Sequence, residues 1–278
     1  MADSEVRYRL VVFDELDDPL KARDLFAEVT GAHPTDAMQW VARVPGLWPK
    51  LLDQGQVRRL LDGLYELEVA AEAWRVDAFP DISRPRTIHE AACLDGGFRV
   101  TGLRGEPTHW VPWDKVELIA AGKVAADDEF REVAPPGWIN ALSTGFRAAM
   151  GKAPRSARKS RAMRIPRDPV GEVLVVRRDP RLAFRIVETK MNYGYLGDRL
   201  AQSAAENFPR LVGDLRRLAS GAIITPTTDD LLDGGDPDEY EFGSSQGLVD
   251  YATLRLLWGW YRRDRDAKEG TNEHPTLP

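Results

Sequence analysis

The chain has 278 residues, of which 43% are hydrophobic and 29% charged, and its formal net charge is −6. The hydrophobic share excludes a wholly disordered protein, and the length fits roughly one to three domains. The negative total excludes a general attraction to nucleic acid, so any such contact would depend on local charge. Cys93 is the single cysteine, which excludes an intramolecular disulfide and fits a reducing compartment.

The chain carries no recognisable membrane or export signal. Residues 1–13 lack the basic region followed by an apolar stretch that marks a signal peptide. The best apolar segment, 248–261, is interrupted by Arg255 and is shorter than the roughly 20 residues that a spanning helix needs. We therefore predict a soluble, cytoplasmic protein without a transmembrane segment.

Residues 1–78 are predicted to form a first α+β module. Residues 7–13 and 71–76 have the composition of strands, and apolar residues recur at helical spacing over 19–30, 35–44 and 53–66, with a short extended piece before the last helix. The order β-α-α-β-α-β predicts a small sheet with helices packed on one side.

The stretch EVTGAHPTDAMQWVARVP, followed by VRRLLDGLYELEVAAEAW, resembles the C-terminal domain of the ribosomal stalk protein L7/L12. The helix–Thr–Gly turn, the helix that ends in Pro and the helix that runs into EVAAEA stand in the same order, without gaps. The resemblance implies that fold, which the protease adaptor ClpS shares. It does not imply the ribosomal partners, because the basic positions on the first two helices hold Asp24, Ala27, Thr35 and Met38.

A proline-containing linker is predicted over 79–86, and a second module over 87–220. We expect strands over 87–94, 98–103, 108–112 and 116–124, a hairpin over 171–177 and 182–191, and a closing helix over 198–218. The segment GFRVTGLRGEPTHWVPWDKVELIAAGKV resembles bacterial pleckstrin-homology-like (PH-like) domains. That resemblance implies an antiparallel sheet or partial barrel closed by a helix.

The second module is interrupted by a basic insertion, predicted to be flexible, over 127–169. Residues 133–167 contain no acidic side chain. A segment rich in Arg, Ser, Ala and Pro suits contact with phosphates of nucleic acid or lipid headgroups, but a solvated loop between strands is the favoured explanation. The candidate anion-binding residues are Arg147, Lys152, Arg155, Arg158, Lys159, Arg161, Arg164 and Arg167.

The C-terminal part is predicted to comprise an acidic linker over 221–245, a docking helix over 246–266 and a disordered tail over 267–278. The helix is apolar on nearly all sides as far as Tyr261, too broadly for a single exposed stripe. We expect its own chain or a second copy, in a homodimer, to cover it. Docking on a membrane surface is the alternative.

No set of residues predicts a catalytic, metal or cofactor site. Residues 243–247 match G-x-S-x-G, but an acidic segment precedes them, and His274 is the only later histidine, so a helix cap at Ser244 or Ser245 explains the serines. His89 and Cys93 could share one face of a strand, but no third group orients them. We therefore predict a protein that is not an enzyme and that uses no cofactor.

These observations predict a non-catalytic protein-interaction adaptor or scaffold with an unknown protein partner. The candidate partner-binding residues are Lys21, Arg23 and Trp40, on or beside the first two helices, together with the groove that receives the last helix. The alternative is a binder of anionic partners through the basic loop 147–167.

Overall fold

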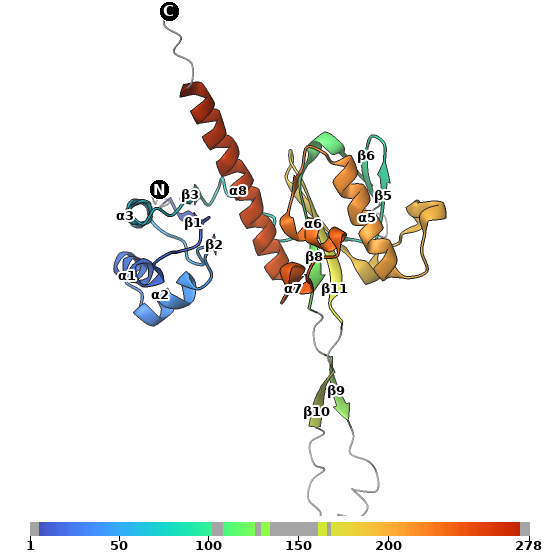
Figure 1. Cartoon of the computed structure of the whole chain (residues 1–278), viewed down its shortest axis with the longest axis horizontal. Coiled ribbons are helices and arrows are strands. Elements are labelled where there is room, and N and C mark those ends of the chain that lie inside the picture. Colours follow the sequence, from blue (N-terminus) through green and yellow to red (C-terminus); the bar gives the residue numbers. More distant parts are fainter. Residues whose placement is uncertain (1–5, 102–107, 126–128, 134–160, 166–167, 273–278) are drawn as a thin grey trace, which may run out of the picture. The chain divides into compact units, whose positions relative to one another are not determined.

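The computed structural model describes residues 6–101, 108–125, 129–133, 161–165 and 168–272. The chain divides into two units, one formed by 1–124 with 171–278 and the other by 125–170. It is a mixed α+β protein whose strand pairs are mostly antiparallel, with a long C-terminal helix (Figure 1).

The N-terminal module has the predicted order β-α-α-β-α-β. Its strands form an antiparallel sheet in the order β2-β1-β3. Asp18 caps α1, and a reciprocal capping box between Asp53 and Gln56 begins α3. The elements are β1 (Tyr8–Val12), α1 (Pro19–Thr30), α2 (Pro34–Val41), β2 (Gly46–Leu47), α3 (Gln54–Glu66) and β3 (Ala71–Arg75).

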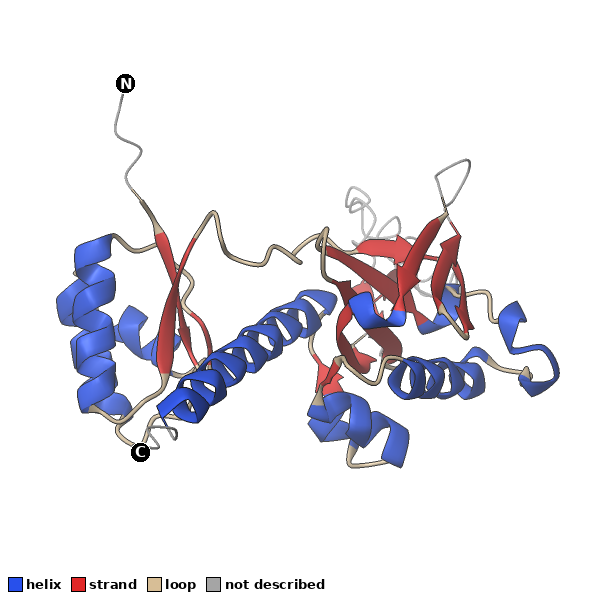
Figure 2. Cartoon of the chain, turned by 90° about the horizontal axis from the view of Figure 1, so that it is seen from above, coloured by secondary structure: helices blue, strands red, loops and turns tan. Residues whose placement is uncertain are grey.

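The strand β1 is buried on both faces. Leu10 and Val12 belong to the core beneath the three helices, which lie on one side of the strands in Figure 2. Val11 and Phe13 belong to a separate apolar cluster with the C-terminal helix. Because successive side chains of a strand point to opposite faces, one short strand serves two cores.

A six-stranded sheet organises the second half of the main unit, in the order β13-β8-β11-β12-β4, with β14 also paired to β8. The hairpin β11/β12 is antiparallel as predicted, but β4 runs parallel to β12, and both β13 and β14 run parallel to β8. The sheet is therefore mixed rather than antiparallel. Its strands are β4 (Arg86–Ile88), β8 (Val116–Val124), β11 (Val170–Arg177), β12 (Leu182–Val187), β13 (Ile223–Ile224) and β14 (Glu241–Phe242).

A three-stranded antiparallel sheet packs beside it, made of β5 (Glu90–Leu94), β6 (Gly97–Thr101) and β7 (His109–Pro112). The single strand predicted over 87–94 is thus two strands in two sheets. The chain changes sheet at His89, whose carbonyl oxygen accepts a 2.7 Å hydrogen bond from the Asn192 backbone.

The closing helix α5 (Ala204–Leu218) begins later than predicted. Residues 194–199 form a 3-10 turn instead, η3 (Gly194–Arg199), broken where Gly197 adopts φ 55°, which favours glycine. The capping box of Ser203 and Glu206 then begins α5. Its apolar face packs on the sheets through Phe208, Leu211 and Leu215.

Residues 221–245 are folded rather than an open acidic linker. They form β13, α6 (Pro226–Asp233), α7 (Pro237–Tyr240) and β14. Asp236 caps α7, and Asp229 lies 2.8 Å from the Arg216 guanidinium. Asp236 thus caps a helix, and Asp229 forms an ion pair. The many acidic residues of this segment make it resemble a linker in the sequence, although it contains the helices α6 and α7.

The C-terminal helix α8 (Ser245–Asn272) is longer than predicted, and its last turns occupy part of the expected tail. In the second unit, β9 (Glu129–Val133) pairs antiparallel with β10 (Arg161–Ile165). Arg161 and Arg164 therefore lie on a strand, whereas the other six candidate anion-binding residues fall outside the described part of the chain.

Candidate functional site at the C-terminal helix

One face of α8 covers the six-stranded sheet. Leu248, Ala252 and Leu256, spaced four residues apart, are fully buried. They pack against Leu118 of β8 and Leu174 of β11. Side chains spaced by four lie on one face of a helix, so these three residues form a single apolar stripe. The stripe does not explain the apolar residues on the other faces of α8.

A second face of the same helix packs against the N-terminal module. Leu257 is fully buried in a cluster with Val11 and Phe13. The Phe13 ring lies 5.1 Å from that of Trp258 and 5.0 Å from that of Tyr261, between centroids. The unusual apolar breadth of the helix thus has a physical reason, since α8 lies against two parts of its own chain. The predicted groove is filled by α8 itself.

Trp260 contacts both parts at once. Its ring centroid lies 5.4 Å from that of Trp74 on β3, and its Nε1 donates a 2.9 Å hydrogen bond to Glu117 Oε1 on β8. The Arg181 guanidinium lies 4.7 Å from the same ring, in cation–π geometry. Gly259 allows α8 to lie close to β13, because a Cβ at this position would overlap the Ile223 side chain.

Two buried carboxylates hold α8 to the sheet. Glu172 Oε1 accepts a 2.8 Å hydrogen bond from Ser245 Oγ at the first residue of the helix, and Glu117 accepts from Trp260 farther along. The second oxygen of each carboxylate has no hydrogen-bond partner among the described residues. Because a buried acceptor without a partner costs free energy, these two hydrogen bonds favour the observed position of α8 on the sheet.

Sequence reasoning missed Glu117 and Glu172. Each interrupts an apolar strand, in VELIAAGKV and VGEVLVV. A charged residue inside a buried strand needs a partner, and that was the available signal.

The predicted partner-binding residues do not point to one common surface. Lys21 is exposed and lies 3.2 Å from Asp18, while Arg23 pairs with Asp24 at 2.6 Å. Two residues of an α-helix turn about 200°, so Lys21 and Arg23 leave α1 in nearly opposite directions. Trp40 is half-buried, with its ring edge-on to Trp48 at 4.5 Å.

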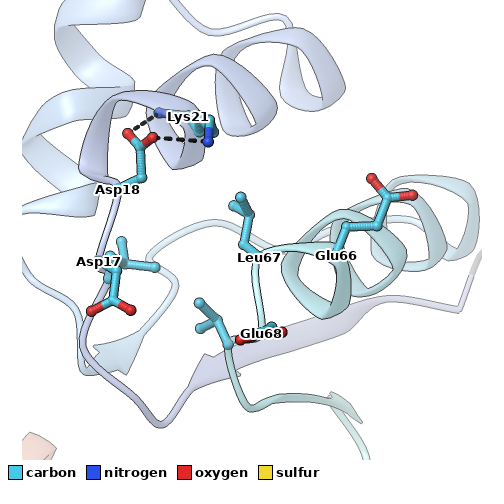
Figure 3. A pocket seen from close by; sticks show the side chains of 8 residues that line it. Asp17, Asp18, Lys21, Glu66, Leu67 and Glu68 are labelled. Atoms are coloured by element: carbon cyan, nitrogen blue, oxygen red, sulfur yellow. Dashed lines mark hydrogen bonds and ion pairs between the residues drawn. The ribbon is translucent and has the colours of Figure 1, made fainter.

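Lys21 also lines a cavity of about 250 Å³ between the first turn of α1 and the end of α3 (Figure 3). Its ammonium pairs with Asp18, and the other charged residues of the lining are acidic (Figure 3). Asp17 and Asp18 come from the loop before α1, and Glu66 and Glu68 from the end of α3. The rest of the lining is apolar, namely Leu16, Leu67 and Val69.

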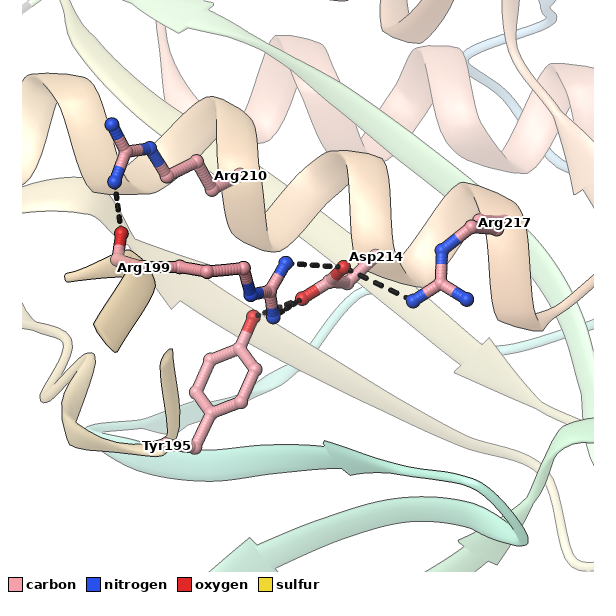
Figure 4. Close-up of polar contacts among 5 residues, drawn as sticks. All are labelled: Tyr195, Arg199, Arg210, Asp214 and Arg217. Atoms are coloured by element: carbon pink, nitrogen blue, oxygen red, sulfur yellow. Dashed lines mark hydrogen bonds and ion pairs between the residues drawn. The ribbon is translucent and has the colours of Figure 1, made fainter. Parts of the chain in front are cut away.

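A polar cluster outside α8 centres on Asp214 of α5 (Figure 4). Arg199 donates two hydrogen bonds to its carboxylate, at 3.0 and 2.7 Å, and the Tyr195 hydroxyl donates a third at 3.2 Å. Arg217 adds a contact of 3.3 Å. Burial opposes ionisation, but the hydrogen bonds from Arg199 and Arg217 hold the pKa of Asp214 below its ordinary value.

Cys93 lies beside this cluster, and its side chain is half-buried. Burial, reinforced by the Asp214 charge, raises the pKa of Cys93 to about 12, so the nucleophilic thiolate is disfavoured. His89 is directed elsewhere, with Nδ1 3.0 Å from the Lys190 carbonyl oxygen. The geometry therefore does not assemble a Cys–His pair.

The G-x-S-x-G segment follows the two-residue strand β14 and begins α8, but β14 is not buried, since Glu241 is exposed and Phe242 half-buried. Ser244 caps the helix, as predicted, because its Oγ accepts a hydrogen bond from the Gly247 backbone. Ser245 donates to Glu172.

In the described part of the chain, no three His, Cys, Asp or Glu side chains gather in a way that could hold a metal ion. None of the described helices combines the length and apolar content needed to cross a bilayer. Comparison of the chain with protein-family models, with curated proteins and with solved structures gives no match.

Proposed function

We propose that the protein is a non-catalytic cytoplasmic adaptor or scaffold that holds a protein partner. The observation that carries the proposal is the position of α8, which buries one face on the six-stranded sheet and another on the N-terminal module. A helix shared in this way packs against two modules of the same chain. The resemblances to the L7/L12 C-terminal domain and to PH-like domains support the same role only as an analogy of fold, because function depends on the site rather than on the fold.

The exposed side of the N-terminal module is the favoured partner surface. Leu20 and Tyr65 are 54% and 83% exposed, although both are large apolar residues. They adjoin Lys21 and Glu66 in the chain, which line the acidic cavity. Large exposed apolar residues next to charged ones are typical of protein interfaces.

Affinity capture from the native cell tests this proposal. The full chain is compared with a Leu20→Ser, Lys21→Glu, Tyr65→Ser variant and with an Arg58→Glu control, whose exposed side chain lies on α3. We expect a protein recovered in defined stoichiometry by the full chain and the control, and lost with the triple variant. Equal recovery by all three chains, or none by any, would count against it.

The second candidate is a binder of anionic partners through residues 147–167. The run of eight basic residues supports it, and two of them lie on the antiparallel pair β9/β10. Paired strands with basic side chains form ribbons that can enter a nucleic-acid groove. Salt-titrated binding to RNA, DNA and acidic vesicles tests it, since phosphate contacts weaken steeply as salt rises.

A further inference from the structure

A second cavity, of about 320 Å³, lies where α8 passes the end of β1. It is separate from the acidic cavity on the N-terminal module. Its walls are mainly apolar and come from both elements and from the loop before β2. The described residues that line it are Phe13, Pro45, Tyr251, Leu254, Arg255 and Trp258.

Arg255 is the one charged residue among those that line this cavity. Its Nε donates a 3.1 Å hydrogen bond to the Tyr251 hydroxyl, and its guanidinium carbon lies 5.2 Å from the centre of the Tyr251 ring. These two contacts position the guanidinium. Its terminal nitrogens have no hydrogen-bond partner among the described residues, so they are available to an anion.

An arginine beside apolar walls selects a ligand with two properties. The guanidinium can donate two parallel hydrogen bonds to a carboxylate, and the walls prefer an aromatic or large aliphatic group. Ligand pockets usually span about 300–1,000 Å³, so this cavity suits one large side chain rather than an extended molecule.

We infer that the cavity binds the C-terminal residue of a partner protein, with an apolar side chain inside and the terminal carboxylate on Arg255. A cavity of this size holds one residue, so the apolar side chain and the carboxylate must belong to the same residue. Only the C-terminal residue of a chain carries a main-chain carboxylate beside its side chain. A buried apolar anchor beside a charge-assisted pair is also how a small contact contributes most to binding. The inference rests on the proposed adaptor function and names the partner's chemistry.

Calorimetric titration of the purified full chain tests it, with acetyl-Gly-Ser-Gly-Phe as the free acid and as the C-terminal amide. We expect the acid to bind at least about tenfold more tightly than the amide. Arg255→Gln should remove that difference, whereas Arg262→Gln, on an exposed residue of the same helix, should preserve it.

Equal binding of acid and amide, or no binding of either at millimolar peptide, would overturn the inference. Binding of 4-phenylbutyrate as tight as that of the peptide acid would also overturn it, because the occupant would then be a small acid. The comparison of acid with amide uses the unaltered chain, so it stands even if a variant fails to fold. The capture experiment tests a different surface, around Leu20, Lys21 and Tyr65. A titration without binding would therefore refute this inference and leave the proposed adaptor function to be tested by capture.

Discussion

Trp260 Nε1 donates a 2.9 Å hydrogen bond to Glu117 Oε1, which joins the C-terminal helix to the strand β8. Glu117 is only 7% exposed, and its other oxygen lies 3.8 Å from the Arg181 guanidinium. The indole thus satisfies a buried carboxylate while its ring packs against Trp74.

Trp260→Phe removes this donor and keeps an aromatic ring. Because it leaves a buried carboxylate oxygen without its partner, we expect the free energy of unfolding to fall by about 1–3 kcal/mol. Urea denaturation measures the change. Trp110→Phe serves as the control, since Trp110 is 45% exposed, and a larger loss there would contradict the role given to Trp260.

Gly259→Ala places a Cβ against the end of the Ile223 side chain, so either that side chain or α8 must shift. Overpacking of this kind costs about 1–3 kcal/mol of stability. Gly213→Ala is the matched control in α5, where a new Cβ meets nothing closer than 4.0 Å and should be neutral or stabilising. Thermal melts of both variants decide. A destabilised Gly213 variant beside an unaffected Gly259 variant would contradict the packing of α8.

Cys93 should react slowly in the folded protein. Its pKa is raised from 9.0 to about 12, first by burial, so near neutral pH the thiolate fraction falls about a thousandfold against a free thiol. Stability from the neutral thiol is present below pH 9.0 and is lost as pH rises toward about 12. Pulse alkylation with iodoacetamide, with and without urea, measures the difference, and rapid labelling without urea would refute this burial.

Asp214→Asn tests the cluster of Figure 4. The pKa of Asp214 lies below 3.8 in the folded chain, so its contribution to stability is present above 3.8 and is lost as pH falls through the lowered pKa. We expect a loss of about 1–2 kcal/mol near pH 7, limited by the exposure of both arginines, that shrinks in acid. Asp62→Asn, on an exposed carboxylate, should change little. An equal loss of stability near pH 7 and in acid, below the lowered pKa, would rule out an electrostatic cause.

Local spacing predicted the N-terminal module well. Strand alternation, helical apolar spacing and cap residues such as Asp53 are local signals, and they set element order without knowledge of the tertiary contacts. The same signals found the hairpin β11/β12 and the helix α8.

Long-range pairing could not be predicted in the same way. Ile223 and Phe242 join β8 through two-residue strands, which are too short to leave a periodic pattern, so the sequence alone favours a linker over 221–245. The partners of Glu117 and Glu172 lie far along the chain, on α8. Their burial in apolar strands indicated that partners exist, but not which residues they are.

Hydrogen exchange of residues 248–261 in the full chain can show whether α8 is covered by two parts of its own chain. We expect slow exchange across this segment, independent of protein concentration, and faster exchange in a Phe13→Ala, Trp74→Ala variant. Rapid exchange in the unaltered chain would contradict it. So would protection that rises with concentration, because a second copy would then be covering the helix.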